Sequence, residues 1–217
     1  MKRSVKISPP ADAYPEAKLT SFSDFYVRLQ RWEGIAKPLD LIGSWTPGRR
    51  AGIAKALSVA FDTAGLLGAT IPGFATSNPQ SSGNKAASFL KERLTDVPGF
   101  QLDVIRGVGY PDFVLRWRDG WCCAEVKSTS KTDGEASSLR VVLTGSTARL
   151  RAEIDRIGNS SRPPCHLLFT LKHTDKGIIT GMRLDFLEPE TDVSVKLEAS
   201  TSRAMLKRGL QKFHSHP

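Results

Sequence analysis

The sequence predicts an α/β fold in which helices flank a mixed central sheet. Apolar residues recur at helical spacing in three segments of the first half, at 21–32, 49–67 and 84–94. Three segments with strand-like alternation follow between residues 100 and 127, and two more lie between residues 165 and 187. Strands of this kind bury their apolar side chains against helices, which predicts a layered α/β domain.

The chain has 217 residues and a formal net charge of +9, with a pI of about 9.7. This length suits one compact domain with a sizeable core. Excess Lys and Arg suits nucleic acid as a partner, because basic side chains displace counterions from phosphates. A basic surface without such a partner explains the charge equally well.

Targeting and redox patterns indicate a cytoplasmic protein without a membrane partner. No run of 18 apolar residues is present, and the basic N-terminus lacks the apolar stretch of a signal peptide. Cys122 and Cys123 are adjacent and Cys165 stands alone, so no CxxC pair suggests zinc. We expect all three cysteines to be buried, reduced thiols.

Residues 1–83 are expected to form an arm and helices that pack on the core. The first 18 residues are rich in Pro and polar side chains and are typical of an arm or loop. The helix at 21–32 carries aromatic residues at helical spacing, and the helix at 49–67 ends near Gly65 and Gly68. A loop is expected at 71–83.

The core is expected to occupy residues 84–187. It begins with a helix at 84–94, which Asp96, Pro98 and Gly99 end. The remaining expected elements are strands at 100–105, 110–117 and 121–127, a loop at 128–138, an extended piece at 140–143, a helix from Thr144 or Ser146 to about residue 157, and strands at 165–171 and 178–187. Residues 188–217 are expected to form a tail with a basic helix at 201–213.

The second and third strands are predicted to form a hairpin around Asp119-Gly120, a typical two-residue turn. In that register Asp112 lies opposite Lys127, and Val114 lies opposite Glu125. Residues two apart on a strand share a face, as do opposed residues. Asp112, Glu125 and Lys127 therefore project from one side. The other side is uniformly apolar and must be core: Phe113, Leu115, Trp117, Cys122, Ala124 and Val126.

Two carboxylates and a lysine on one face can support phosphate chemistry. The backbones of Asp112 and Glu125 should lie roughly 5–8 Å apart. Carboxylates without nearby His or Cys favour Mg²⁺, or Mn²⁺ as a substitute, over zinc. Such an ion polarises a phosphate and acidifies a water, while Lys127 can hold that water or offset phosphate charge.

A second interpretation makes the same residues an ion-pair cluster on an exposed sheet face. The register also depends on Pro111, which lacks a backbone donor and could introduce a bulge just before Asp112.

The run Pro111-Asp112, twelve intervening residues, and Glu125-Val126-Lys127 resembles the PD-(D/E)XK nuclease superfamily. The succession of elements over residues 84–187 is similar to that family's αβββαβ core. The resemblance implies that Asp112 and Glu125 bind the metal, with the Val126 carbonyl facing it, and that Lys127 assists the water. Many members also supply a helical glutamate, for which Glu92 is the candidate; a solvated surface charge is the alternative.

Several residues are candidates for DNA contact. Hydroxyls and a lysine directly after the catalytic strand suit phosphates, and the helix expected from Ser146 carries arginines on its flanks. The candidates are Ser128, Thr129, Lys131, Arg149 and Arg151. A flexible polar loop and a solvated helix face are the alternatives.

Within the superfamily, size and organisation most resemble a type II restriction endonuclease, which implies a homodimer cutting double-stranded DNA at a specific site. A repair nicking enzyme or junction resolvase of the same fold is the second hypothesis. A binding domain without catalysis is the third, and the intact set of Asp112, Glu125 and Lys127 argues against it.

Overall fold

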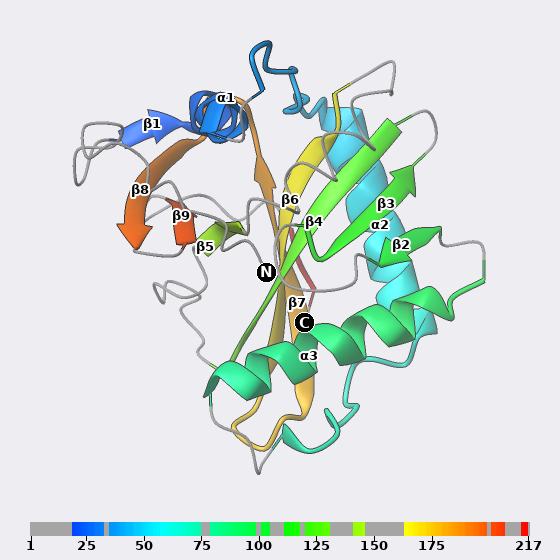
Figure 1. Ribbon diagram of the computed structural model, residues 1–217. Helices are drawn as coiled ribbons and strands as arrows, with labels where there is room; N and C mark the ends of the chain where they lie inside the picture. Colours follow the sequence, from blue (N-terminus) through cyan, green and yellow to red (C-terminus); the bar gives the residue numbers. More distant parts are fainter. Residues whose placement is uncertain are drawn as a thin grey trace, which may run out of the picture.

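A six-stranded mixed sheet forms the centre of the molecule (Figure 1). The computed structural model describes residues 19–32, 35–74, 79–98, 101–104, 111–117, 120–130, 141–145, 163–198, 201–206 and 214–216. The strand order is β10-β7-β6-β4-β3-β2, and only the β4–β6 pair is parallel. The strands are β2 (Leu102–Val104), β3 (Phe113–Trp117), β4 (Gly120–Thr129), β6 (Cys165–His173), β7 (Ile179–Leu187) and β10 (His214–His216).

The described residues form three α-helices, α1 (Phe22–Trp32), α2 (Pro47–Thr63) and α3 (Pro79–Thr95). Helix α2 starts where the Thr46 side chain accepts a hydrogen bond from the Arg49 N–H, with Pro at the first helical position. Helix α3 starts at Pro79, so the loop expected through residue 83 is too long. The absent N–H of Pro79 costs nothing in a first turn, and Gly83 is tolerated inside the helix.

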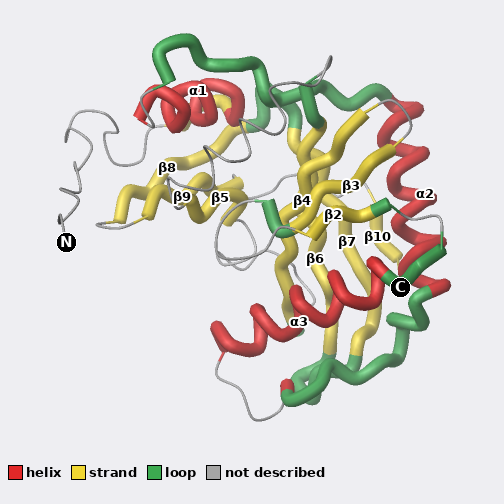
Figure 2. Tube along the Cα trace, turned by 45° about the vertical axis from the view of Figure 1, so that its right-hand side comes forward, coloured by secondary structure: helices red, strands yellow, loops and turns green. Residues whose placement is uncertain are grey.

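One face of the sheet carries the main core. Phe113 and Leu115 from β3 pack with Ala124 and Val126 from β4, and all four are buried. Helices α2 and α3 contribute their apolar stripes to the same cluster, with Ile53, Leu57, Phe61, Leu90 and Leu94. Figure 2 shows α2 along the sheet and α3 across its lower end. The predicted apolar face is confirmed, and the Trp117 side chain lies outside the description.

The opposite face of the sheet is covered as well. His166 on β6 is fully buried beneath α1, where it makes edge contacts with Phe22 and Tyr26 at centroid distances of 5.4 and 5.8 Å. Its Nε2 lies 2.7 Å from the Leu41 carbonyl oxygen. This second face is therefore covered at β6, and it carries further buried polar residues: Glu125, Thr170, Arg183 and Asp185.

A second sheet of four strands, in the order β1-β8-β9-β5, lies beside α1 (Figure 1). Its strands are β1 (Leu19–Ser21), β5 (Val141–Gly145), β8 (Asp192–Glu198) and β9 (Thr201–Leu206). The predicted C-terminal helix is wrong for residues 201–206, because β9 pairs with both β8 and β5. Thr144 lies within β5 rather than at a helix start, and the helix expected up to residue 157 lies outside the described residues.

The predicted fold class, α/β with a mixed central sheet and flanking helices, is confirmed. Cys122, Cys123 and Cys165 are free and buried, as expected. In the part of the chain described, no helix combines the length and apolar character needed to cross a membrane.

Candidate active site

The β3–β4 hairpin differs from its predicted register by two residues. Val114 lies opposite Cys123 rather than Glu125, and Trp117 lies opposite Gly120. The paired segment begins at Phe113, so Asp112 lies just outside the ladder and does not pair with Lys127 in it. The observed pairing puts Arg116 across from Trp121, with the guanidinium 4.4 Å from the ring centroid, a contact that the predicted register lacks.

A shift of two residues leaves every side chain on its predicted face, because strand side chains alternate with a period of two. Glu125 and Lys127 therefore still share the face opposite the apolar core. Gly120 belongs to β4 rather than to the turn, and residues 118 and 119 lie outside the described residues.

Asp112 lies where β3 begins, at the margin of the paired strands. Its own N–H donates to the Ala124 carbonyl oxygen at 2.9 Å, and its Oδ2 accepts from the Val126 N–H at 2.8 Å. Pro111 precedes it and ends the ladder, so the Asp112 carboxylate takes the place of a strand carbonyl opposite Val126. Since the N–H and C=O of one strand residue point the same way, the Val126 carbonyl also faces this side.

Glu125 is the most buried charged residue of the cluster, with 4% of its surface exposed. Its Oε1 accepts from the Lys127 ammonium at 2.7 Å, whereas its Oε2 is buried without a hydrogen-bond partner. Burial raises the pKa of Glu125 from 4.5 to about 7, and the nearby Asp112 adds to the rise, while Lys127 opposes it. This burial rules out an ion-pair cluster on an exposed sheet face.

The donor set fits a hard divalent cation. Glu125 Oε2 is an unsatisfied buried oxygen, which is costly unless a cation or proton completes it. Asp112 and the Val126 carbonyl add oxygen donors beside it. No cluster of three or more His, Cys, Asp or Glu occurs among the described residues. Mg²⁺ does not require one, because it usually binds one or two carboxylates and fills its shell with water and phosphate.

Helix α3 supplies a lysine to this site. The Lys91 ammonium lies 3.3 Å from Asp112 Oδ1, and its side chain is 15% exposed. The neighbouring Glu92, the predicted helical glutamate, is exposed on another side of the helix. Lys91 follows buried Leu90 and is three residues before buried Leu94, so its place at the edge of the apolar stripe was readable from helical spacing.

The predicted DNA-contact residues are only partly described. Ser128 and Thr129 belong to β4 rather than to a loop, so they point to opposite faces. Thr129 shares the face of Glu125 and Lys127 and is buried, while half-buried Ser128 lies on the core side. Lys131, Arg149 and Arg151 lie outside the described residues.

The polar face continues beyond β4 into the interior. Lys127 neighbours Thr170 on β6, which in turn lies opposite Arg183 on β7. Arg183 donates to Asp185 Oδ1 from two nitrogens, at 2.9 and 2.7 Å, and both residues are buried. The charged cluster of β3, β4 and α3 is thus bordered by a second ion pair.

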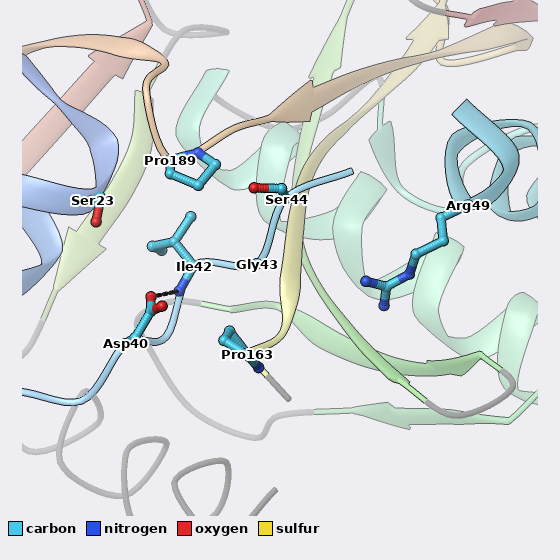
Figure 3. A pocket seen from close by; sticks show the side chains of 8 residues that line it. All are labelled: Ser23, Asp40, Ile42, Gly43, Ser44, Arg49, Pro163 and Pro189. Atoms are coloured by element: carbon cyan, nitrogen blue, oxygen red, sulfur yellow. Dashed lines mark hydrogen bonds between the residues drawn. The ribbon is translucent and has the colours of Figure 1, made fainter. Parts of the chain in front are cut away.

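A separate pocket of about 450 Å³ lies near the start of α2 (Figure 3). Its lining residues are Ser23, Asp40, Ile42, Gly43, Ser44, Arg49, Pro163 and Pro189. Gly43 donates to the Pro164 carbonyl oxygen at 2.7 Å, and a Cβ on it would lie 2.5 Å from the Pro163 oxygen. The pocket shares no residue with the acidic cluster, and it holds no buried side chain without a partner among the described residues.

Comparison with known proteins adds no relative: no family model, curated protein or solved structure matches this chain.

Proposed function

We propose that this protein is a Mg²⁺-dependent endodeoxyribonuclease that hydrolyses phosphodiester bonds in double-stranded DNA at a specific site. The observation that carries the proposal is the Glu125 carboxylate, buried beside Asp112 with Oε1 on Lys127 and Oε2 without a partner. A carboxylate in this state is completed by a cation or by a proton, and the described residues of the site offer a cation oxygen donors.

The arrangement of elements supports placing the chain in the PD-(D/E)XK superfamily. Helix α3 is followed by the antiparallel strands β2, β3 and β4, and β6 then pairs in parallel with β4. These elements correspond to the αβββ part and the last strand of the αβββαβ core that the motif implies, while the second helix of that core is expected in residues outside the described ones. The motif residues lie at the start of β3 and within β4, beside one another.

Each residue has a separate part in the proposed reaction. Asp112, Glu125 and the Val126 carbonyl would hold a divalent ion, which would supply positive charge to polarise a phosphate and acidify a water. Lys127 brings a second positive charge, which holds the attacking water or offsets charge that develops on the phosphate. The Val126 N–H fixes Asp112 in place, and burial excludes competing water from Glu125.

The basic character of the chain supports DNA as the substrate. A net charge of +9 favours binding to a polyanion. Arg116 is exposed and stacks on Trp121. Trp121 lies on the same face of β4 as Glu125 and precedes it by four residues. That separation corresponds to about 13 Å, within the footprint of a bound duplex. A homodimer with one site per strand is the assembly that cutting both strands of a symmetric site calls for.

Incubation of the protein with a long DNA and Mg²⁺ tests this proposal. Discrete fragments are expected, because a site-specific enzyme cuts at few positions. A smear would indicate a nonspecific nuclease, and nicked circles a nicking enzyme. An unchanged DNA that the protein nevertheless retains in a gel shift would favour a binding domain and overturn the proposal.

Substitutions at the cluster identify the site itself. Asp112→Ala and Lys127→Ala should each reduce cleavage by at least about 10²-fold, because the first removes a ligand of the metal and the second a positive charge aimed at the phosphate. Binding of DNA without metal should remain within a few fold of wild type. Cleavage at wild-type rates by either variant would show that the chemistry lies elsewhere.

A further inference from the structure

The proposed metal ligands already carry their own counter-charges. The described cluster holds two carboxylates, Asp112 and Glu125, and two ammonium groups, Lys91 and Lys127. With both lysines charged and both acids ionised, the four groups sum to zero. The cluster is thus electrically balanced without any divalent ion, which is unusual for a site that must attract one.

The two lysines contact carboxylates that differ in whether an oxygen is left without a partner. Lys127 is paired with Glu125 Oε1, and the second oxygen of Glu125 stays unpartnered. Asp112 has no such free oxygen, because Lys91 lies against Oδ1 and the Val126 N–H against Oδ2. The Val126 contact is part of the backbone framework, whereas Lys91 reaches in on a flexible side chain from α3.

Asp112 binds a divalent ion more strongly once Lys91 leaves it. An ammonium group and a divalent cation on one carboxylate repel each other, and low exposure of the site strengthens that repulsion. Lys91 is 15% exposed and Asp112 is 22% exposed, so water screens the pair only partly. Once displaced, the Lys91 ammonium needs another anion close to Asp112.

We propose that Lys91 is a positioning residue that exchanges partners, neutralising Asp112 in the free protein and contacting a substrate phosphate once a divalent ion is bound. This inference rests on the proposed nuclease function, because that function supplies the phosphate. It makes metal binding and DNA binding mutually reinforcing: the phosphate draws Lys91 away, and the vacated carboxylate accepts the ion. By linkage, each ligand increases affinity for the other by the same factor.

Binding of Mn²⁺ to the protein without DNA tests the exchange directly. The free-ion EPR signal reports the affinity of wild type, Lys91→Met, Lys91→Arg and Lys85→Met. Met keeps the length of the side chain without the charge, so Lys91→Met should bind Mn²⁺ about tenfold more tightly than wild type. Lys91→Arg should bind like wild type. Lys85 lies on the same helix and contacts the Gly73 carbonyl, so Lys85→Met is the matched control and should not change the affinity.

Asp112→Asn in the Lys91→Met background locates the ion, because it should abolish the gained affinity. Should Lys91→Met fail to fold by circular dichroism, Lys91→Gln serves the same measurement. Equal or weaker Mn²⁺ binding after loss of the Lys91 charge would overturn the exchange.

A DNA-cleavage measurement distinguishes failure of this inference from failure of the nuclease proposal. At saturating Mn²⁺, Lys91→Met should cleave DNA at least tenfold more slowly than wild type despite its tighter metal binding, because the phosphate has lost its cation. Wild-type cleavage by Lys91→Met would overturn the phosphate contact. If wild type cleaves no DNA while Lys91→Met still gains Mn²⁺ affinity, the nuclease proposal fails and the competition between Lys91 and the ion stands.

Discussion

Glu125 is a single residue at which the fold keeps an incompletely paired carboxylate in its interior. Its carboxylate has one ion-pair partner and one bare oxygen, in a position with 4% exposure. Burial favours the neutral acid, so the pKa of Glu125 is raised from 4.5 to about 7. A carboxyl group whose pKa is higher in the folded than in the unfolded state stabilises the folded protein at low pH. That stabilisation is lost as the pH rises through the folded-state pKa.

Glu125→Gln should therefore stabilise the metal-free protein at pH 8. The raised pKa corresponds to roughly 3 kcal/mol, and we expect a gain of about 1–3 kcal/mol in the free energy of unfolding. At pH 5 the folded wild-type carboxyl is protonated, so less than about 1 kcal/mol of this difference should remain, and the rest should vanish below pH 4.5. Urea unfolding at both pH values measures this, with exposed Glu190→Gln as the control. Equal stability at pH 8 would contradict the buried, unsatisfied state of Glu125.

His166 gives the opposite pH dependence, because burial lowers its pKa from 6.5 to about 4. The neutral ring is favoured in the folded state, so stability is complete above pH 6.5 and is lost as the pH falls toward 4. Wild type should lose about 2–3 kcal/mol more than His166→Gln between pH 7 and pH 4.5, since Gln can keep the bond to Leu41 without titrating. Urea unfolding of both proteins at the two pH values checks this; a matching loss would show that His166 is not the titrating group.

The β3–β4 hairpin shows which parts of an element are readable from sequence. Alternation of apolar and charged residues predicted both faces correctly, because a register error of two residues leaves each side chain where it was. The register itself was wrong, since either of two adjacent residue pairs could close the turn. The deciding contact, Arg116 over Trp121, joins two strands and has no local pattern.

That stacked pair leads to a prediction about DNA affinity. Arg116→Ala should reduce the slope of log affinity against log salt concentration by about 1, because one phosphate contact is lost. Arg93→Ala is the matched control, since Arg93 stacks on Phe89 at 5.4 Å on α3, and its slope should equal that of wild type. Fluorescence anisotropy with a short random duplex in EDTA measures both. A slope for Arg116→Ala equal to wild type would remove the pair from the DNA surface.

The C-terminal strands show where local pattern failed. Residues 201–206 carry apolar side chains that also fit a helix, and their strand structure depends on pairing with β8 and β5. The alternation in β8, with Val193, Val195 and Leu197 between polar residues, was a usable strand pattern that the tail prediction overlooked. Lys91 is the comparable residue in the site. The family motif suggested Glu92, whereas the apolar stripe of the helix places Lys91, one residue earlier, beside the core.

At the scale of the whole molecule, the predicted class and central sheet are those observed, and a second sheet is added that the sequence did not predict. The site is compact because β4 and the start of β3 carry its acids and Lys127, while α3 reaches it with one side chain. Under the proposed function, one such site per chain would act on one DNA strand at a time.

Cleavage of both strands should accordingly require two chains on one duplex. Sedimentation velocity of Asp112→Ala with its target duplex should give a complex of two chains, and the wild-type cleavage rate at low protein concentration should rise with the square of that concentration. Free duplex and protein alone are the controls. A complex of one chain that releases doubly cut DNA would contradict the homodimer.

The parallel pairing of β4 with β6 also sets the order in which the protein folds. The β3–β4 hairpin closes across two residues, whereas β6 can join β4 only after residues 130–164 have been brought round. Closure of the longer segment costs more chain entropy, so that contact forms later. Asp112, Glu125 and Lys127 therefore meet in an early, wet hairpin, where Glu125 still ionises as it would in a peptide. The dry surroundings on which the proposed reaction depends are expected to form in the late step, when β6 pairs with β4 and excludes water from residues that are already neighbours.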